Sequence, residues 1–146
     1  MTIDRRLVVM ASASFLAPAA WAAPAGLSGA WKGAWVYSLD PTAFRDPQMR
    51  KPFTALLRER NARFGGETDE PNTFADPRLK RLRATVAGAR KDRDLSFVKT
   101  YATAEVRHSV DYRGQADRAF TKVEGIWAIG ADGGLWRMVR TEAAIS

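Results

Sequence analysis

Apolar and polar side chains alternate along most of this chain, and clusters of turn-forming residues separate the alternating runs. Successive side chains of a β-strand point to opposite faces, so such alternation is typical of strands with one buried face. In one run, for example, Val106, His108, Val110 and Tyr112 share a face, and polar residues occupy the other. The pattern predicts strands over residues 30–38, 52–59, 62–68, 80–89, 94–101, 106–113, 119–129 and 134–141.

The joints between these runs are short. They fall near residues 90–93, 102–105, 114–117 and 130–134, and the last contains Asp132-Gly133, a strong hairpin signal. Short joints make consecutive strands antiparallel, because a parallel return needs a crossover of about a dozen residues or more. Eight antiparallel strands can close on themselves, which removes exposed edges. We therefore predict an all-β fold, an eight-stranded antiparallel up-and-down β-barrel (a meander), as a single domain over residues 30–146.

One predicted strand is ambiguous in sequence. Within residues 52–59, Leu56 and Leu57 follow Phe53 at positions i+3 and i+4, which is the spacing of apolar residues on one face of a helix. Phe53, Ala55 and Leu57, however, alternate with other residues as they would in a strand. The alternation continues the pattern of the rest of the chain, so our prediction for this segment is a strand.

Two stretches are predicted to be loops. Residues 38–50 contain two prolines, which cannot donate ladder hydrogen bonds, so this segment should cross one end of the barrel. Residues 64–77 hold four carboxylates and no Lys or Arg, and their Asp, Asn and Pro content is typical of turns. Two alternatives stay open for 64–77, a binding element at the barrel mouth or a hard-cation site, although the spacing does not match an EF-hand loop. The carboxylates are those of Glu67, Asp69, Glu70 and Asp76.

The N-terminal residues predict export. Arg5 and Arg6 precede a short apolar run, and the small residues of Ala20-Trp21-Ala22 follow it. This order is typical of a secretory signal peptide, and the run is shorter than the roughly 20 residues of a membrane-spanning helix. We expect a signal peptide over residues 1–22, a flexible lead-in over residues 23–29, no transmembrane segment, and a periplasmic or secreted location.

Several classes of chemistry have no support in the composition. The chain has no Cys and one His, which excludes thiol catalysis, Cys-based metal sites and a zinc centre with several His ligands. The G-x-S-x-G, P-loop and G-x-G-x-x-G motifs are absent from the sequence. We therefore assign no catalytic residue, metal site or cofactor, and favour a non-enzymatic role over a small hydrolase or isomerase.

The chain is basic, with a formal net charge of +7. Its densest basic stretch, residues 78–93, contains no aromatic side chain that could stack on bases, which disfavours nucleic acid as a partner. A solvated strand face explains this stretch most simply. The alternative is contact with an anionic envelope component such as lipid or polysaccharide.

Two short motifs, one at the start of the first predicted strand and one in the sixth, are similar to those of a known group. "GAW" at residues 29–31 resembles the G-x-W start of the calycin superfamily (lipocalins, fatty-acid-binding proteins and avidins), and "VDY" at residues 110–112 is similar to the T-D-Y element of lipocalins, with Val110 in place of Thr. The resemblance implies a small barrel in which Trp31 packs against a basic residue of the last strand, either Arg137 or Arg140. It implies no particular ligand.

An eight-stranded barrel is just wide enough to be filled by side chains or to hold one small ligand. We expect the second case, with a small apolar or aromatic molecule bound in a cavity of roughly 300 Å³ or more. The alternative is a solid barrel whose outer surface binds a protein or polyanion. Lys99 has two orientations open to it, inward with a partner or outward in solvent. The residues expected to contact the ligand are Trp35, Tyr37, Lys99, Tyr101, His108, Tyr112 and Trp127.

Overall fold

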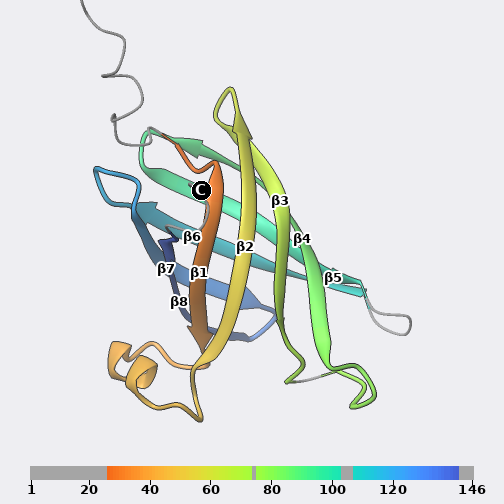
Figure 1. Ribbon diagram of the computed structural model, residues 1–146. Helices are drawn as coiled ribbons and strands as arrows, with labels where there is room; N and C mark the ends of the chain where they lie inside the picture. Colours follow the sequence, from red (N-terminus) through yellow and green to blue (C-terminus); the bar gives the residue numbers. More distant parts are fainter. Residues whose placement is uncertain (1–25, 74, 103–106, 142–146) are drawn as a thin grey trace, which may run out of the picture.

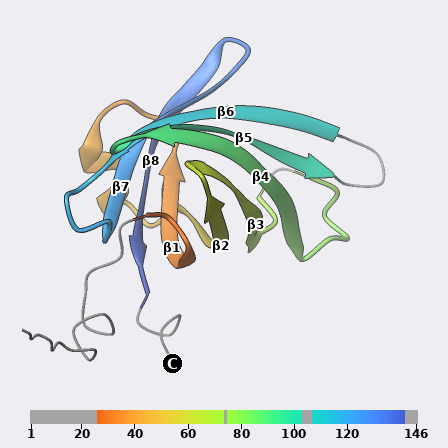
Figure 2. The ribbon, with the colours of Figure 1, turned by 90° about the horizontal axis from the view of Figure 1, so that it is seen from above.

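The chain forms a closed antiparallel barrel in which each strand pairs with the next and β1 pairs with β8. The computed structural model describes residues 26–73, 75–102 and 107–141. Figure 2 shows the sheet from above, curling until β1 lies beside β8. The predicted all-β meander is confirmed (Figure 1). Its strands are β1 (Gly29–Val36), β2 (Lys51–Arg60), β3 (Arg63–Pro71), β4 (Arg81–Lys91), β5 (Asp94–Ala102), β6 (Arg107–Ala116), β7 (Lys122–Ile129) and β8 (Asp132–Arg140).

Side-chain parity determines which face of each strand is buried. On β2, Phe53, Ala55 and Leu57 point into the barrel, while Leu56 is 52% exposed on the outside. The alternation was therefore the correct guide for residues 52–59, because helical spacing would have buried Leu56 as well. The expected signal peptide and Val106 lie outside the described residues.

Two-residue turns connect β2 to β3, β4 to β5 and β7 to β8, and the last of these turns is not where the sequence signal places it. Asn61 and Ala62 join β2 to β3 with φ of 53° and 65°, as a type I′ turn requires. The β7–β8 turn is Gly130-Ala131, because Ile129 pairs with Asp132. Asp132-Gly133 therefore opens β8 instead of forming the turn, and Gly130, with φ of 55°, supplies the left-handed conformation.

The connection between β1 and β2 contains the 3₁₀ helix η2 (Pro41–Arg45), which packs on the outer face of β1 instead of crossing the end of the barrel as predicted. The Asp40 carboxylate caps this helix by accepting a hydrogen bond from the Thr42 backbone N–H. Phe44 packs on Val36, on the outer face of β1, and forms a small second core there. We call this end, where β1 finishes and β8 begins, the open end; it is the lower end in Figure 1.

The opposite end, which we call the closed end, is sealed by Trp31. Its side chain is 1% exposed, and the Arg140 guanidinium lies 4.4 Å above its ring. Arg140 also donates hydrogen bonds to the carbonyl oxygens of Gly26 and Ser28. The expected contact between Trp31 and a basic residue of the last strand is thus present with Arg140, whereas Arg137 points outward and lies over the Phe44 ring at 4.2 Å.

Residues 26–28 belong to the closed end and Gly29 begins β1, so the flexible lead-in expected over residues 23–29 is wrong for residues 26–29, whereas residues 23–25 lie outside the described residues. Leu27 is fully buried, and its carbonyl oxygen accepts a hydrogen bond of 2.9 Å from Trp31 Nε1. Its backbone N–H donates to Glu59, which also pairs with Arg90 at 2.8 Å. Leu27 is therefore held in a fixed position at the closed end, because its side chain is buried and both of its backbone groups are hydrogen-bonded.

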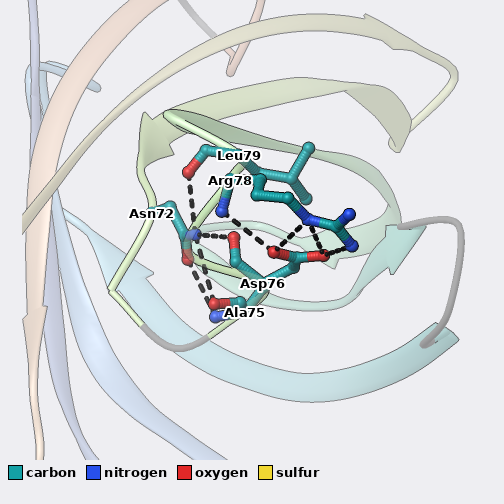
Figure 3. A network of polar contacts seen from close by, with 5 residues as sticks. All are labelled: Asn72, Ala75, Asp76, Arg78 and Leu79. Atoms are coloured by element: carbon teal, nitrogen blue, oxygen red, sulfur yellow. Dashed lines mark hydrogen bonds and ion pairs between the residues drawn. The ribbon is translucent and has the colours of Figure 1, made fainter.

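In the acidic segment 64–77, the strand predicted over residues 62–68 is confirmed and extends further than expected, which corrects the loop prediction for the residues that follow it. β3 continues to Pro71, so Glu67 and Asp69 point outward while Glu70 points into the barrel. The turn that follows is organised by Asn72, whose side-chain nitrogen donates to the carbonyl oxygens of Ala75, Asp76 and Leu79 (Figure 3). Asp76 pairs with Arg78 in the same turn. The carboxylates therefore diverge, which is unfavourable for a shared cation.

Among the described residues, no helix is long and apolar enough to cross a membrane.

Candidate functional site

A pocket of about 190 Å³ lies at the open end of the barrel. It is formed where β1, β5 and β7 finish and where β6 and β8 begin, so residues distant in sequence converge there. Its volume is below the roughly 300 Å³ of pockets for drug-sized molecules. The lining residues are Trp35, Tyr37, Tyr101, His108, Val110, Tyr112, Trp127, Ile129 and Asp132.

The rest of the barrel interior is filled with side chains. Phe97 stacks on Tyr112 with ring centroids 4.7 Å apart, and Trp136 makes T-shaped contacts with both rings. Phe64 contacts Phe97 from the closed-end side. Between the pocket and the closed end these side chains pack against one another, and the void beside Lys99 and Phe97 measures only about 10 Å³.

Three rings form one wall of the pocket. Trp35, Tyr37 and Trp127 contact one another edge to face, with centroids 5.1 to 5.5 Å apart and planes 77° to 80° apart. Trp127 is held by a hydrogen bond from its Nε1 to the Val36 carbonyl oxygen at 3.1 Å. Tyr37 follows the end of β1 and is 57% exposed, so it stands at the mouth. The wall is rigid at its base and open to solvent at its rim.

A buried carboxylate lies beneath this wall. Glu70 is 1% exposed, and its Oε2 accepts hydrogen bonds from Lys99 Nζ at 2.7 Å and from the Tyr101 hydroxyl at 2.8 Å. Its Oε1 accepts a hydrogen bond from Trp35 Nε1 at 3.2 Å. A buried charge must be paired and hydrogen-bonded to be tolerated, and both oxygens of Glu70 meet this requirement.

Lys99 is the partner of Glu70 and points inward, while Val98 on the same strand is exposed. Its ammonium lies 5.0 Å from the centroid of the Phe53 ring and 4.9 Å from that of Tyr101, so aromatic faces complete its surroundings. Burial lowers the pKa of Lys99, and the nearby Glu70 carboxylate acts in the opposite direction. Lys99 does not line the pocket; it lines a void of about 10 Å³ deeper in the barrel.

The two tyrosines of the pocket floor differ in their hydroxyl groups. Burial, and next the charge of Glu70, raises the pKa of both Tyr101 and Tyr112, so both hydroxyls keep their protons. Tyr101 donates to Glu70, whereas the contacts of Tyr112 among the described residues are ring contacts with Phe97, Trp136 and Lys99. The Tyr112 hydroxyl is therefore a donor without a hydrogen-bond acceptor in this part of the chain.

His108 lies at the rim instead of in the deep interior. It is half-buried, and its ring is 5.1 Å from that of Tyr101 with the planes tilted by 37°. Its alternation with Val110 and Tyr112 places it on the pocket side of β6, near the start of that strand. The ring can contact a ligand entering from solvent.

Six of the seven residues expected to contact a ligand thus line one pocket, and Lys99 does not. The sequence pattern does not identify Glu70, which it places in a loop, nor Asp132 and Ile129 at the rim. The sequence does contain one indication for Glu70: it is an even number of residues from Phe64, which places both side chains on the same face if the segment is one strand. The described residues contain no group of three His, Cys, Asp or Glu side chains that could hold a metal ion.

A scan against models of known protein families finds no match to this chain, and a search of curated proteins finds none either.

Proposed function

We propose that the protein binds a small molecule, about the size of one aromatic ring, in the pocket at the open end. The observation that carries this proposal is a pocket walled by aromatic side chains in a barrel that is otherwise filled. A protein cavity of about 150 Å³ with apolar walls is large enough to bind benzene. A volume of about 190 Å³ therefore fits one ring with a short polar substituent.

The polar groups support binding over catalysis. Titratable groups do converge, as a small hydrolase or isomerase would need, but Glu70 and Lys99 neutralise each other and neither lines the pocket. Both carboxylate oxygens of Glu70 already accept hydrogen bonds. The Tyr112 hydroxyl is left to orient a ligand through one hydrogen bond, which is typical of apolar pockets with few polar groups.

The wider setting of this proposal comes from the sequence. The predicted signal peptide supports a periplasmic or secreted binding protein. The barrel and the Trp31–Arg140 contact support a calycin-like protein, a superfamily whose G-x-W start the chain resembles.

Titration of intrinsic tryptophan fluorescence tests the proposal, because Trp35 and Trp127 line the pocket. Benzyl alcohol and toluene are suitable probes, with and without a hydroxyl group. We expect saturable quenching by both, with a Kd for benzyl alcohol on the order of 0.1 mM, given its few heavy atoms. Ile129→Phe should weaken both probes by partly filling the pocket.

The Tyr112→Phe variant makes the test specific. It should weaken benzyl alcohol by roughly 2- to 10-fold, the equivalent of one hydrogen bond, and leave toluene unchanged. His108→Ala should weaken both probes through lost rim contact. If neither probe quenches the fluorescence of the unmodified protein, the binding proposal is wrong and a role for the outer surface replaces it.

One observation favours a second candidate function, contact with an anionic surface. Arg58, Arg60 and Arg63 border a shallow groove along the β2–β3 hairpin. No ion pair to a described acidic residue accompanies these three exposed arginines. Retention on immobilised heparin, lost in an Arg58/Arg60/Arg63→Gln variant and retained in Arg45→Gln at the open end, would support it; equal retention of both variants would exclude this groove.

A further inference from the structure

The charges around the pocket are arranged asymmetrically. The deep ion pair has its carboxylate bonded to two side chains that line the pocket, Trp35 and Tyr101. Its ammonium lines the small void on the other side, next to Phe53 and Met138. The carboxylate is therefore the partner of this pair that is hydrogen-bonded to the pocket lining, while the ammonium lies over the ring faces of Tyr101 and Tyr112.

The pocket rim carries a negative charge as well. Asp132, the first residue of β8, lines the mouth and is exposed. No described basic side chain forms an ion pair with it. Among the described lining residues it is the one acidic group, and none of them is Lys or Arg. In a chain whose net charge is +7, this is an electronegative recess.

The walls favour cations for an independent reason. The face of an aromatic ring carries negative charge density and attracts cations, Trp most strongly. Five aromatic side chains line the pocket, two of them Trp. The protein already stabilises one ammonium in this way, because Lys99 lies over the rings of Phe53, Tyr101 and Tyr112.

We propose that the pocket selects a small organic cation, an amine or quaternary ammonium group carried on or near one ring-sized apolar body. This inference rests on the proposed binding function and names the charge of its ligand. The aromatic faces hold the charged group, and Asp132 at the rim and Glu70 beneath the floor supply the attraction. An anionic molecule of the same size meets Asp132 first and is disfavoured.

Three probes of equal size separate charge from shape: benzylammonium, benzyl alcohol and benzoate. We expect benzylammonium to bind roughly 5- to 30-fold more tightly than benzyl alcohol, the range for a partly desolvated cation on aromatic faces, and benzoate to bind most weakly. Choline should likewise exceed its uncharged isostere 3,3-dimethylbutan-1-ol, which shows that the positive charge and not an N–H donor is recognised.

Two variants locate the source of the preference. Asp132→Asn should weaken benzylammonium about 2- to 5-fold and leave benzyl alcohol unchanged, while Asp111→Asn, which removes an exposed carboxylate from the outer face of β6, should change neither. The double variant Glu70→Gln/Lys99→Met removes both charges of the buried ion pair and should reduce the remaining preference.

The outcomes distinguish this inference from the function on which it rests. Equal binding of benzylammonium and benzyl alcohol, or tighter binding of benzoate, would overturn the cation preference and leave ligand binding established. Failure of all three probes to bind would overturn both. A preference for benzylammonium that survives Asp132→Asn and the double variant would show that the aromatic faces, and not these carboxylates, provide it, and the assigned roles of Asp132 and Glu70 would be wrong.

Discussion

The two ends of the barrel use the same kinds of side chain with opposite results. At the closed end, Trp31 lies beneath Arg140. The guanidinium of this arginine donates hydrogen bonds to the carbonyl oxygens of Gly26, Ser28 and Phe120. At the open end, Trp35 and Trp127 stand against each other and leave a pocket beside them. An aromatic residue closes a barrel where a cation from the chain itself covers its face. At the open end Lys99 lies over the rings of Tyr101 and Tyr112, but no described cation of the chain covers Trp35 or Trp127, so the faces of these two rings are available to a ligand.

The first test of this difference between the two ends removes the ring that seals the closed end. Trp31→Ala should lower the free energy of unfolding by about 3–5 kcal/mol, because it truncates a fully buried aromatic residue. Chemical denaturation measures the change. Trp31→Phe keeps an aromatic face under Arg140 and should cost clearly less; equal losses in the two variants would mean that the cation–ring contact contributes little.

The second test removes the ion pair between Lys99 and Glu70 under the pocket. Lys99→Met alone should cost about 3 kcal/mol, since it leaves Glu70 buried with only neutral donors. Adding Glu70→Gln removes the stranded charge and keeps an oxygen for Tyr101 and Trp35. The double variant should therefore recover most of the loss, and a thermodynamic cycle measured by denaturation reports the coupling. A double variant as unstable as the single one would contradict this account.

A smaller effect concerns acid sensitivity at the closed end. The hydrogen bond from Arg90, and to a lesser extent that from Leu27, lowers the pKa of Glu59 below the ordinary value of 4.5 for this side chain, against the effect of burial. The folded state thus binds this proton less readily than the unfolded state does. The stabilisation is fully present above about pH 4.5 and is lost as the pH falls through the lower folded-state pKa.

Glu59→Gln should therefore cost about 1 kcal/mol at neutral pH and less at pH 3, where the unmodified protein has lost much of the same contribution. Unfolding curves at both pH values measure the difference. Glu124→Gln, which alters an exposed carboxylate on β7, is a suitable control. A cost for Glu59→Gln that does not change with pH would show that the carboxylate titrates normally in the folded protein.

The barrel followed from the sequence because its cause is local. Period-two alternation and short joints are properties of neighbouring residues, and they identified the strands and the inward parity of Trp35, Tyr101 and Tyr112. The turn error at Asp132-Gly133 has a local cause too, since Gly130 competes for the same role and the pairing of Ile129 with Asp132 decides between them.

Glu70 was not predictable in the same way. It lies on β3 and its partner Lys99 on β5, two strands that are not neighbours, so the rules for cross-strand pairs do not connect them. They meet because the sheet curls and brings their inner faces together. Curvature across β3, β4 and β5 gives each charge a partner, and a sequence pattern carries no information on how tightly the sheet curls.

The pairing of β1 with β8 also determines when the protein can become fully folded. Hairpins between consecutive strands can form from nearby residues, but Trp31 and Arg140, which lie opposite each other in the β1–β8 ladder, come from the two extremes of the barrel sequence. Contacts between such distant segments form slowly, because a long loop must first be closed. Until β1 pairs with β8, each of them is an edge strand with one unpaired side, which favours association between chains. We expect the burial of Trp31 to be the last step of refolding, detectable by stopped-flow fluorescence as a phase that Trp31→Phe removes and that lags behind the formation of β-structure in circular dichroism.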